Sequence, residues 1–379
     1  MDSHLENTFY DIIVIGCGLS GISLVLELCN RTKKKILILE KKKELTNDKN
    51  WCFWNHPFNE FVNNSDHSWK NIKINYENKV IIKKDTKFSY HNIPSIKLYN
   101  KILQKVKFYS NLDILFNQDI TDIIEGNNLV QIISNKRKYK SKIVFDSRPP
   151  KFKNNRLIQH FLGVEYLFDK KVFNKNEVTL MDFQKKNNAI HFFYILPFTD
   201  KRGLIETTYF SKNTFEKEKY IEDIDKYVKK NYPNKKFKKI GIEQGIIPMH
   251  HICNKNNSKR VIAIGTANNW IRRSSGYGFQ NAFKNSKVIV DQIIKEEPII
   301  IKQRTTTKFL DSVFCQLLEK NPIEGIKVFM SFFSDLELKT IIKFLTNTHS
   351  FADTLKVLWV LPKAKLMYYA LITILKNDK

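Results

Sequence analysis

Cysteine is scarce in this chain, and the cysteines that occur are not arranged as a metal or redox site. Five are present, at positions 17, 29, 52, 253 and 315, and none shows C-x-x-C spacing. The adjacent His250 and His251 also lack a partner at metal-ligand spacing. We therefore expect reduced thiols, a cytoplasmic setting and no metal centre.

The sequence also lacks a hydrophobic run of the roughly 20 residues that a membrane-spanning helix needs. Two apolar stretches near the C-terminus, Val357 to Leu361 and Leu366 to Leu375, are interrupted by Pro362-Lys-Ala-Lys365. No basic segment precedes the first apolar stretch, as it would in a signal peptide. A soluble or peripheral protein is expected.

Acidic residues are few relative to basic ones. The 38 Asp and Glu residues against 64 Lys and Arg give a formal net charge of +26. Three explanations are open: binding of nucleic acid, attraction to anionic lipid, or a genome biased towards Lys, Asn and Ile codons. Because the lysines are spread along the chain and form no single block, codon bias is the favoured explanation, attraction to lipid comes next and nucleic acid last. As a partner we expect an anionic membrane surface and no nucleic acid.

The first forty residues carry the most specific motif. An apolar strand pattern, a glycine turn and an apolar helical pattern follow one another between residues 11 and 28. In such a motif Gly16 permits the tight turn, Gly18 lets a pyrophosphate approach the backbone, and Gly21 lets the helix pack on the strand. Glu40 ends the next apolar run, about 20 residues on, where an acid accepts a bond from a ribose hydroxyl. The pattern predicts a bound dinucleotide; the alternative is a glycine turn in an ordinary α/β sheet.

Strand-like and helical patterns divide the chain into six segments without internal repeats. The halves of a nucleotide site bracket β-rich segments, as in large flavoproteins, and helices follow. The sequence thus predicts an α/β fold, with a Rossmann-type FAD-binding domain, a β-rich substrate-domain insertion and a C-terminal helical lobe. The expected limits are 8–50, 108–160 and 255–300 for FAD binding, 51–107 and 161–254 for the β-rich parts, and 301–379 for the helical lobe.

A single carboxyl interrupts the apolar strand pattern of residues 203–210. A buried Glu206 without a cationic partner would have a raised pKa and could donate a proton near neutral pH. In strict alternation Glu206 shares one face with Thr208, while Thr207 and Tyr209 lie on the other. The alternative is a glutamate on the solvent face of an edge strand.

Two further segments are candidates for the site. Gly265 ends a short buried strand, and Gly276 and Gly278 precede a helix, so their backbone could approach a flavin ring or form a plain loop. The aromatic cluster Trp51–Trp54 could be core, or could wall an apolar pocket and stabilise a carbocation through its π electrons.

An ordered set of short motifs runs nearly from end to end of the chain. The set comprises Tyr10–Leu19, Trp51–Trp54, Asp146–Arg148, Phe161–Glu165, Met181-Asp182, Tyr194–Pro197 with Leu204–Thr208, Glu243–Gly245 with Pro248, Arg272 with Ser274–Tyr277, and Ile341–Leu345, Ala352-Asp353 and Leu361–Lys363. In this order it resembles the flavin-dependent lycopene cyclases of bacteria.

The resemblance implies a lycopene β-cyclase, which closes the ψ-ends of lycopene into the β-rings of β-carotene without net redox change. Glu206 matches the acid implicated in catalysis. Reduced FAD would serve as cofactor, NAD(P)H as reductant, and lycopene or other linear carotenoids as substrates at the inner face of the cell membrane. The expected lining of a water-free pocket is Trp54, Phe192, Phe193, Tyr194, Tyr209 and Trp270.

Four positions, at three places in the motif set, depart from the family pattern. Many members carry a second acid directly after the key glutamate, where this chain has Thr207. Arg273 stands where proline is common, and Asn268-Asn269 replaces a glycine pair. The late flavin loop is therefore expected to have its own shape.

Three other functions fit parts of the sequence. A flavin monooxygenase or prenyl reductase acting on an isoprenoid would share the nucleotide motif and consume NAD(P)H. A flavoprotein that modifies tRNA would account for the net charge of +26. A degenerate flavin-binding protein with a structural role would account for the departures at Thr207 and Arg273.

Overall fold

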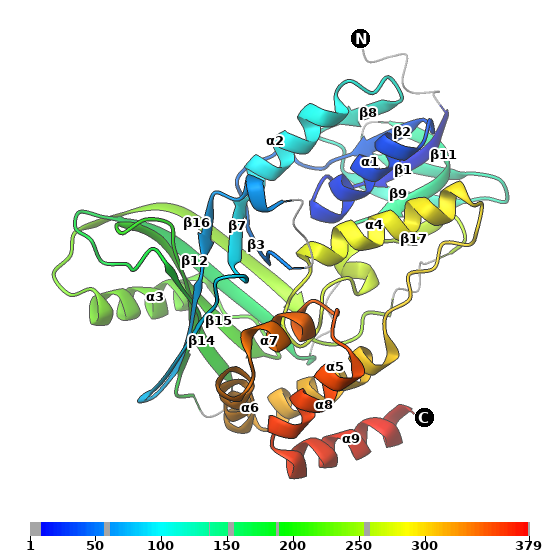
Figure 1. Ribbon diagram of the computed structural model, residues 1–379. Coiled ribbons are helices and arrows are strands. Elements are labelled where there is room, and N and C mark those ends of the chain that lie inside the picture. Colours follow the sequence, from blue (N-terminus) through cyan, green and yellow to red (C-terminus); the bar gives the residue numbers. More distant parts are fainter. Residues whose placement is uncertain are drawn as a thin grey trace.

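Two large sheets and a terminal group of helices form the protein in the computed structural model (Figure 1). The structure describes residues 9–377, except 57–60, 136, 151–154, 187–188 and 254–257. The two sheets lie on opposite sides of the molecule, and the helices that follow residue 305 close the space below them (Figure 1).

The first sheet is the predicted nucleotide-binding unit. Its strand order is β8-β2-β1-β11-β10-β9, and β17 pairs with β11. β1 runs parallel to β2 and β11, and its side chains alternate between two buried clusters, as expected for a strand covered on both faces. The strands are β1 (Phe9–Ile15), β2 (Ile36–Leu39), β8 (Leu112–Leu115), β9 (Ile120–Glu125), β10 (Val130–Ser134), β11 (Lys138–Asp146) and β17 (Val261–Ala263).

Three helices pack together on one face of this sheet. They are α1 (Leu19–Arg31), α2 (Ser95–Val106) and α4 (Phe279–Ile294), and all contribute to one hydrophobic cluster. α2 lies within a segment predicted to belong to the β-rich part, yet Leu98 and Ile102 pack into the cluster that includes Ile22 of α1. Apolar residues at helical spacing thus attach α2 to the nucleotide-binding side.

The second sheet is long and strongly twisted, with the order β16-β12-β15-β14-β13-β5-β6. Its strands are β5 (Asn71–Tyr76), β6 (Lys79–Lys84), β12 (Ile158–Phe168), β13 (Glu177–Gln184), β14 (Ile190–Pro197), β15 (Arg202–Ser211) and β16 (Phe237–Pro248). α3 (Lys217–Asn231) covers its outer face (Figure 1). A small sheet of β3 (Asn50–Trp54), β7 (Tyr90–Pro94) and β4 (His67–Trp69) lies between the two large sheets.

The C-terminal part is helical. It contains α5 (Thr305–Lys320), α6 (Pro322–Asp335), α7 (Leu338–Leu345), α8 (Phe351–Val360) and α9 (Lys363–Asn377). Pro322 begins α6, and a capping box of Ser350 and Asp353 begins α8. No single helix among the described residues has the length and apolarity to cross a membrane; α8 and α9 meet the criteria only as a pair bent by 120°.

The predicted fold class is confirmed: a mixed α/β protein with a β-rich part and a helical C-terminal region. The strands of the first sheet fall within the expected limits 8–50, 108–160 and 255–300, although β12 of the second sheet begins before residue 160. The domain limits themselves stay a prediction.

The glycine turn allows a matched test of packing. A Cβ on Gly21 would lie 2.0 Å from the carbonyl oxygen of Gly16, whereas a Cβ on Gly18 would meet nothing within 4 Å. Because overpacking costs about 1–3 kcal/mol, we expect Gly21→Ala to lower the unfolding temperature by several degrees, and Gly18→Ala to leave it unchanged. Thermal unfolding followed by circular dichroism checks this, and equal unfolding temperatures would contradict it.

Candidate active site

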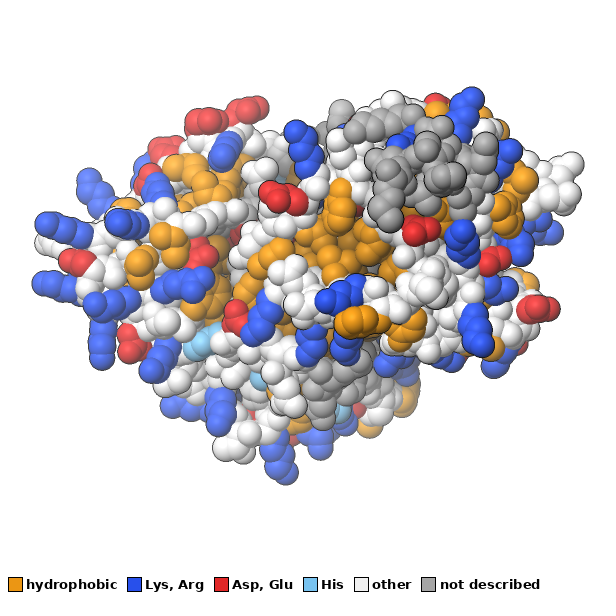
Figure 2. Space-filling model, turned by 90° about the horizontal axis from the view of Figure 1, so that it is seen from above, with side chains coloured by type: hydrophobic (Ala, Val, Ile, Leu, Met, Phe, Trp, Pro, Cys, Tyr) orange, Lys and Arg blue, Asp and Glu red, His pale blue; other side chains and the backbone are white. Residues whose placement is uncertain are grey.

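A cavity of about 1080 Å³ lies between the two large sheets and the helical lobe. Its volume is at the upper end of the roughly 300–1,000 Å³ typical of small-molecule sites. Seen from above, hydrophobic side chains line a hollow in the middle of the molecule, with Lys and Arg side chains spread around it (Figure 2). The cavity brings together three predicted elements: the glycine turn, the late glycine loop and the strand of Glu206.

The glycine turn forms one end of this cavity. Gly16 has φ +91°, a conformation that favours glycine, and Gly18 lines the cavity at the start of α1. No side chain among the described residues caps this helix start, which belongs to the cavity lining, so its first N–H groups remain for an anionic ligand. Glu40 is buried at the end of β2, and its carboxylate accepts hydrogen bonds from the backbone N–H of Cys17 at 2.6 Å and of Lys42 at 2.9 Å. The predicted acid therefore lies directly at the turn.

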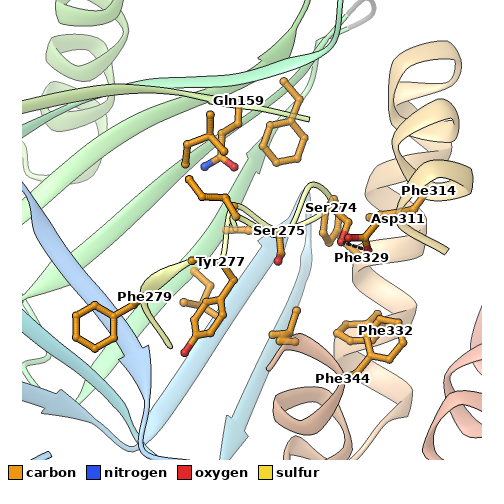
Figure 3. Close-up of a pocket in the computed structure, with 18 of the residues that line it drawn as sticks. Gln159, Ser274, Ser275, Tyr277, Phe279, Asp311, Phe314, Phe329, Phe332 and Phe344 are labelled. Atoms are coloured by element: carbon orange, nitrogen blue, oxygen red, sulfur yellow. Dashed lines mark hydrogen bonds between the residues drawn. The ribbon is translucent and has the colours of Figure 1, made fainter. Parts of the chain in front are cut away.

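The late glycine loop reaches into the middle of the cavity (Figure 3). Gly265, Gly276 and Gly278 all line it, and Gly276 has φ +69° where a Cβ would meet the side chain of Gln159 at 2.8 Å. The Tyr277 hydroxyl accepts a hydrogen bond from the backbone N–H of Trp54 at 2.9 Å. The loop is thus tied both to the second sheet and to β3.

The departure at Asn269 is explained by its backbone. Asn269 has φ 56°, and asparagine is among the residues that tolerate this region in place of glycine. Its side chain also bonds the backbone N–H and carbonyl of Ile252, at 2.8 and 3.0 Å. Asn269 therefore keeps a backbone conformation that glycine favours.

A buried ion pair anchors the loop to the helical lobe. Arg272 Nε lies 3.1 Å from Asp311 of α5, with 2% and 6% of the two side chains exposed. Ser274 donates to the same carboxylate at 2.7 Å (Figure 3), and Arg272 also stacks on Phe344 of α7 and donates to its carbonyl oxygen. Arg273 lies nearer the surface and donates to the Lys308 carbonyl.

Glu206 lies on the cavity wall, in the middle of β15. It is 5% exposed, and its Oε1 accepts a hydrogen bond from Thr208 at 2.7 Å. Burial, together with the negative charge of Glu243, raises the pKa of Glu206 well above its ordinary value of 4.5. Burial and the neighbouring charge thus favour the neutral, proton-donating form of this carboxyl.

Sheet register places Glu243 opposite Glu206. Gly163 of β12 pairs with Glu206 of β15 on one side and with Glu243 of β16 on the other. A Cβ on Gly163 would already contact the Glu206 Cβ at 3.2 Å, so glycine leaves the space in which the two carboxyls meet. Two strand spacings of about 4.8 Å each separate the two backbones, a distance that two facing glutamate side chains can bridge.

Glu243 differs from Glu206 in its surroundings. It is half-buried because it faces the cavity, and it accepts hydrogen bonds from the backbone N–H and side-chain amide of Asn50, at 3.0 and 2.6 Å. Burial raises the pKa of Glu243 to about 7, while Asn50 and the nearby Lys49 favour its ionised form. The pair thus consists of Glu206, whose neutral form is favoured, and Glu243, whose pKa is about 7.

Aromatic side chains form most of the remaining wall. Phe314 of α5, Phe329 and Phe332 of α6, and Phe344 of α7 face the glycine loop from the helical side (Figure 3). Tyr194 donates to the Tyr90 hydroxyl at 3.2 Å beside the carboxyl pair. From the sheets and loops come Trp54, Tyr90, Phe161, Phe192, Tyr194, Phe210 and Trp270.

Two of the predicted pocket residues do not line the cavity. Trp54, Tyr194 and Trp270 do, but Phe193 and Tyr209 lie on the opposite face of the sheet, beneath α3. Phe193 stacks on Tyr227 at 3.9 Å between ring centroids, and Tyr209 donates to Asp223 at 2.6 Å. The prediction was wrong because side chains alternate along a strand, and these two positions are out of phase with the cavity face.

The same alternation explains the departure at Thr207. Its side chain points towards α3 and bonds His191 at 2.8 Å, so an acid at this position of β15 would not face the cavity. The second carboxyl of this site instead comes from β16, as Glu243. The sequence motif Glu243–Gly245 contains this carboxyl, but the strand register that brings the carboxyl to Glu206 is not contained in local sequence.

The whole chain was compared with known proteins. A family model described as "Lycopene cyclase protein" matches residues 11–370. No curated protein matches the sequence. Among solved structures, a geranylgeranyl bacteriochlorophyll reductase-like protein from Thermoplasma acidophilum is 13% identical, with a TM-score of 0.63 over 95% of this chain and 98% of that chain.

Two further solved structures share the fold. A flavoprotein/dehydrogenase from Cytophaga hutchinsonii is 12% identical, with a TM-score of 0.63 over 98% of this chain and 100% of that chain. A probable FAD-dependent monooxygenase from Pseudomonas aeruginosa is 12% identical, with a TM-score of 0.55 over 90% of this chain and 100% of that chain. At these identities the likeness shows the fold alone.

The carboxyl pair predicts a pH-dependent stability. The pKa of both carboxyls is raised above 4.5, so the contribution of each to stability is present below about pH 4.5, and that of Glu243 is lost as the pH rises through its pKa of about 7. As the pH rises from about 5 to about 8, the stability of the Glu243→Gln variant should therefore fall less than that of the unaltered protein. Thermal unfolding at each pH is the measurement.

The matched control for this test is Glu165→Gln, which removes a carboxylate paired with Arg202 away from the cavity. The buried His91, His160 and His191 have lowered pKa values and act in the opposite direction, but they are common to all three proteins. Equal pH slopes for Glu243→Gln and the unaltered protein would contradict the prediction.

Proposed function

The chain belongs to the lycopene cyclase family, and on that premise we propose that it is a lycopene β-cyclase. It would close the ψ-ends of lycopene to the β-rings of β-carotene, an isomerisation with no net redox change. The observation that carries the proposal is the buried Glu206 carboxyl, with its raised pKa, on the wall of an aromatic cavity. To protonate an alkene, a carboxyl must hold a proton to donate, and the cation that forms must be kept from water.

The glycine-rich end of the cavity fits FAD. Gly18 leaves open space beside the start of α1, and Glu40 lies at the turn where a ribose would be held. The buried Trp270 Nε1 and Ser275 Oγ line the cavity and have no hydrogen-bond partner within the described part of the chain, so a bound ligand could satisfy them. Reduced FAD would supply electron density that stabilises a nearby cation, and NAD(P)H would serve only to reduce it.

The reaction then uses the two carboxyls in turn. Glu206 gives its proton to the terminal double bond, which forms a C–H bond and leaves a tertiary cation. The cation closes the ring beside aromatic faces such as those of Phe192 and Tyr194. Glu243, with a pKa of about 7, accepts the proton lost from the new ring. Transfer of that proton to Glu206 restores the pair.

A second candidate function is an FAD- and NAD(P)H-dependent monooxygenase or prenyl reductase. It is favoured by the fold shared with a reductase-like protein and with a probable monooxygenase. Such an enzyme would consume NAD(P)H in proportion to its product, and a cyclase would not.

We also propose that the enzyme is a peripheral protein of the inner face of the cell membrane. Its substrate dissolves in the bilayer, and its basic residues and apolar C-terminal helices suit an anionic lipid surface.

Expression in a bacterium that accumulates lycopene tests the activity. We expect β-carotene when the pigments are separated by chromatography, because the site provides both an acid and a base. A product with a single ring would mean a monocyclase. Unchanged lycopene in cells that contain soluble, flavin-loaded protein would favour the second candidate function.

The carboxyl pair predicts distinct variant phenotypes. Glu206→Gln should abolish β-carotene formation while FAD stays bound, because the amide keeps the shape of the side chain but has no proton to give. Glu243→Gln should slow turnover and remove the loss of activity below about pH 7. Pigment chromatography, the flavin absorbance of the purified protein and pH–rate profiles are the measurements.

Glu165→Gln is the control, since its carboxyl lies outside the cavity lining. Normal turnover by Glu206→Gln would remove this residue from the mechanism. A pH profile of Glu243→Gln that matches the unaltered enzyme would leave Glu243 without a role in proton transfer.

A further inference from the structure

We propose that the bent pair α8–α9 forms the port through which the substrate enters the cavity directly from an anionic lipid bilayer. The inference rests on the proposed function for the identity of the substrate. Its structural basis is separate: one cavity extends from the carboxyl pair to the exposed apolar surface of these two helices.

The cavity lining reaches the surface at α8 and α9. Leu355, Trp359 and Met367 line the same cavity as Glu206, although they are 51%, 76% and 64% exposed. Lys363, between the two helices, also belongs to the lining, and its Nζ lies 4.0 Å from the centroid of the Trp359 ring. A long apolar molecule could therefore pass from this surface to Glu206 without leaving apolar surroundings.

Exposed apolar side chains are concentrated on this part of the molecule. Nine of the 23 exposed large hydrophobic side chains among the described residues lie on α8 and α9, which lie at the outer edge of the molecule (Figure 1). The inner face of α9 packs on α5, through Tyr369 against Val313 and Leu317. The nine exposed residues are Phe351, Leu355, Leu358, Trp359, Met367, Tyr368, Leu371, Ile374 and Leu375.

The charges around this surface suit an anionic partner. Between residues 351 and 375 the sequence has three lysines and a single acid, Asp353. Asp353 is buried and forms the capping box of α8, whereas Lys356 and Lys363 are exposed. Lysines beside exposed tryptophan and aliphatic side chains are typical of helices that lie in the interface of an anionic membrane.

The bend favours insertion into one leaflet over a span. The axes of α8 and α9 differ by 120°, and neither helix alone is long enough to cross. An elbow of this kind can bury Trp359 and Met367 below the headgroups while Lys363 stays at their level. A soluble protein partner would cover the apolar side chains equally well, but it would not supply an insoluble substrate to the cavity mouth.

Trp359 provides a direct probe of insertion. The other four tryptophans are buried or half-buried, so a change in tryptophan emission on contact with a membrane comes mainly from Trp359. We expect vesicles of phosphatidylcholine and phosphatidylglycerol in equal parts to shift its emission to shorter wavelength, and brominated acyl chains to quench it. Trp359→Phe should abolish the quenching but still float with the vesicles. An emission spectrum unaffected by brominated vesicles would overturn the proposal.

Serine substitutions test the port against a matched control. The triple variant Tyr368→Ser, Leu371→Ser, Leu375→Ser changes exposed apolar residues of α9 outside the cavity lining and should bind vesicles about tenfold more weakly. Val80→Ser with Ile82→Ser, also at exposed apolar positions, should bind normally. A monomer–dimer equilibrium that the triple variant abolishes, without any effect of vesicles, would overturn the proposal in favour of a second copy of the chain.

The substrate's source separates this inference from the proposed function. With lycopene in vesicles, the triple variant should lose most of its cyclase activity; with lycopene in detergent micelles, it should keep it. Equal activity of the triple variant and the unaltered enzyme towards lycopene in vesicles would overturn the port. If the unaltered enzyme forms no product from either source, the proposed function fails, while vesicle binding still decides whether α8–α9 docks on lipid.

Discussion

The site depends on two carboxyls that share one apolar cavity. Ionising both would place two like charges side by side in an apolar cavity, so retention of a proton by the pair is favoured. This state requires the register β15-β12-β16, the missing side chain of Gly163 and the hydrogen bonds from Asn50 to Glu243. A shift of one residue in β16 would turn Glu243 to the other face of the sheet. The geometry of the second sheet is therefore inseparable from its chemistry.

A second constraint connects the glycine loop to the helical lobe. Arg272 and Asp311 are nearly fully buried, and separating them would leave an unpaired charge inside the protein, which typically costs about 3–5 kcal/mol. The contacts of Arg272 with Phe344 extend this link from α5 to α7. The loop that lies between the glycine turn and Glu206 is consequently held by the helices that also form the aromatic wall. The loop cannot move away from α5 without breaking this pair.

Much of this architecture could be predicted from local patterns. The glycine turn, the late loop, the position of Glu206 and the C-terminal helices each follow from residue spacing, and the family assignment is confirmed. What local patterns do not contain is the pairing of distant strands. Glu243 was found only as part of a motif, because its partner lies 37 positions away and is reached through Gly163. Phe193 and Tyr209 were misplaced even though the alternation that puts Glu206 on one face puts Tyr209 on the other. The aromatic character of these two residues does not determine which face of the sheet they occupy; strand alternation does.

The proposed cyclisation requires a cavity that is dry for its chemistry and yet open for its substrate. A carbocation reacts with water, so an entrance in contact with solvent would defeat the purpose of a neutral, buried acid. The apolar side chains around α8 and α9 are unfavourable in water, and they surround the mouth of the same cavity. Covering them with lipid would remove both difficulties at once, because hydrocarbon excludes water from the mouth and carries the apolar substrate. On the proposed function, the exposed apolar surface, which is unfavourable in water, would then be what allows the carboxyl pair to work.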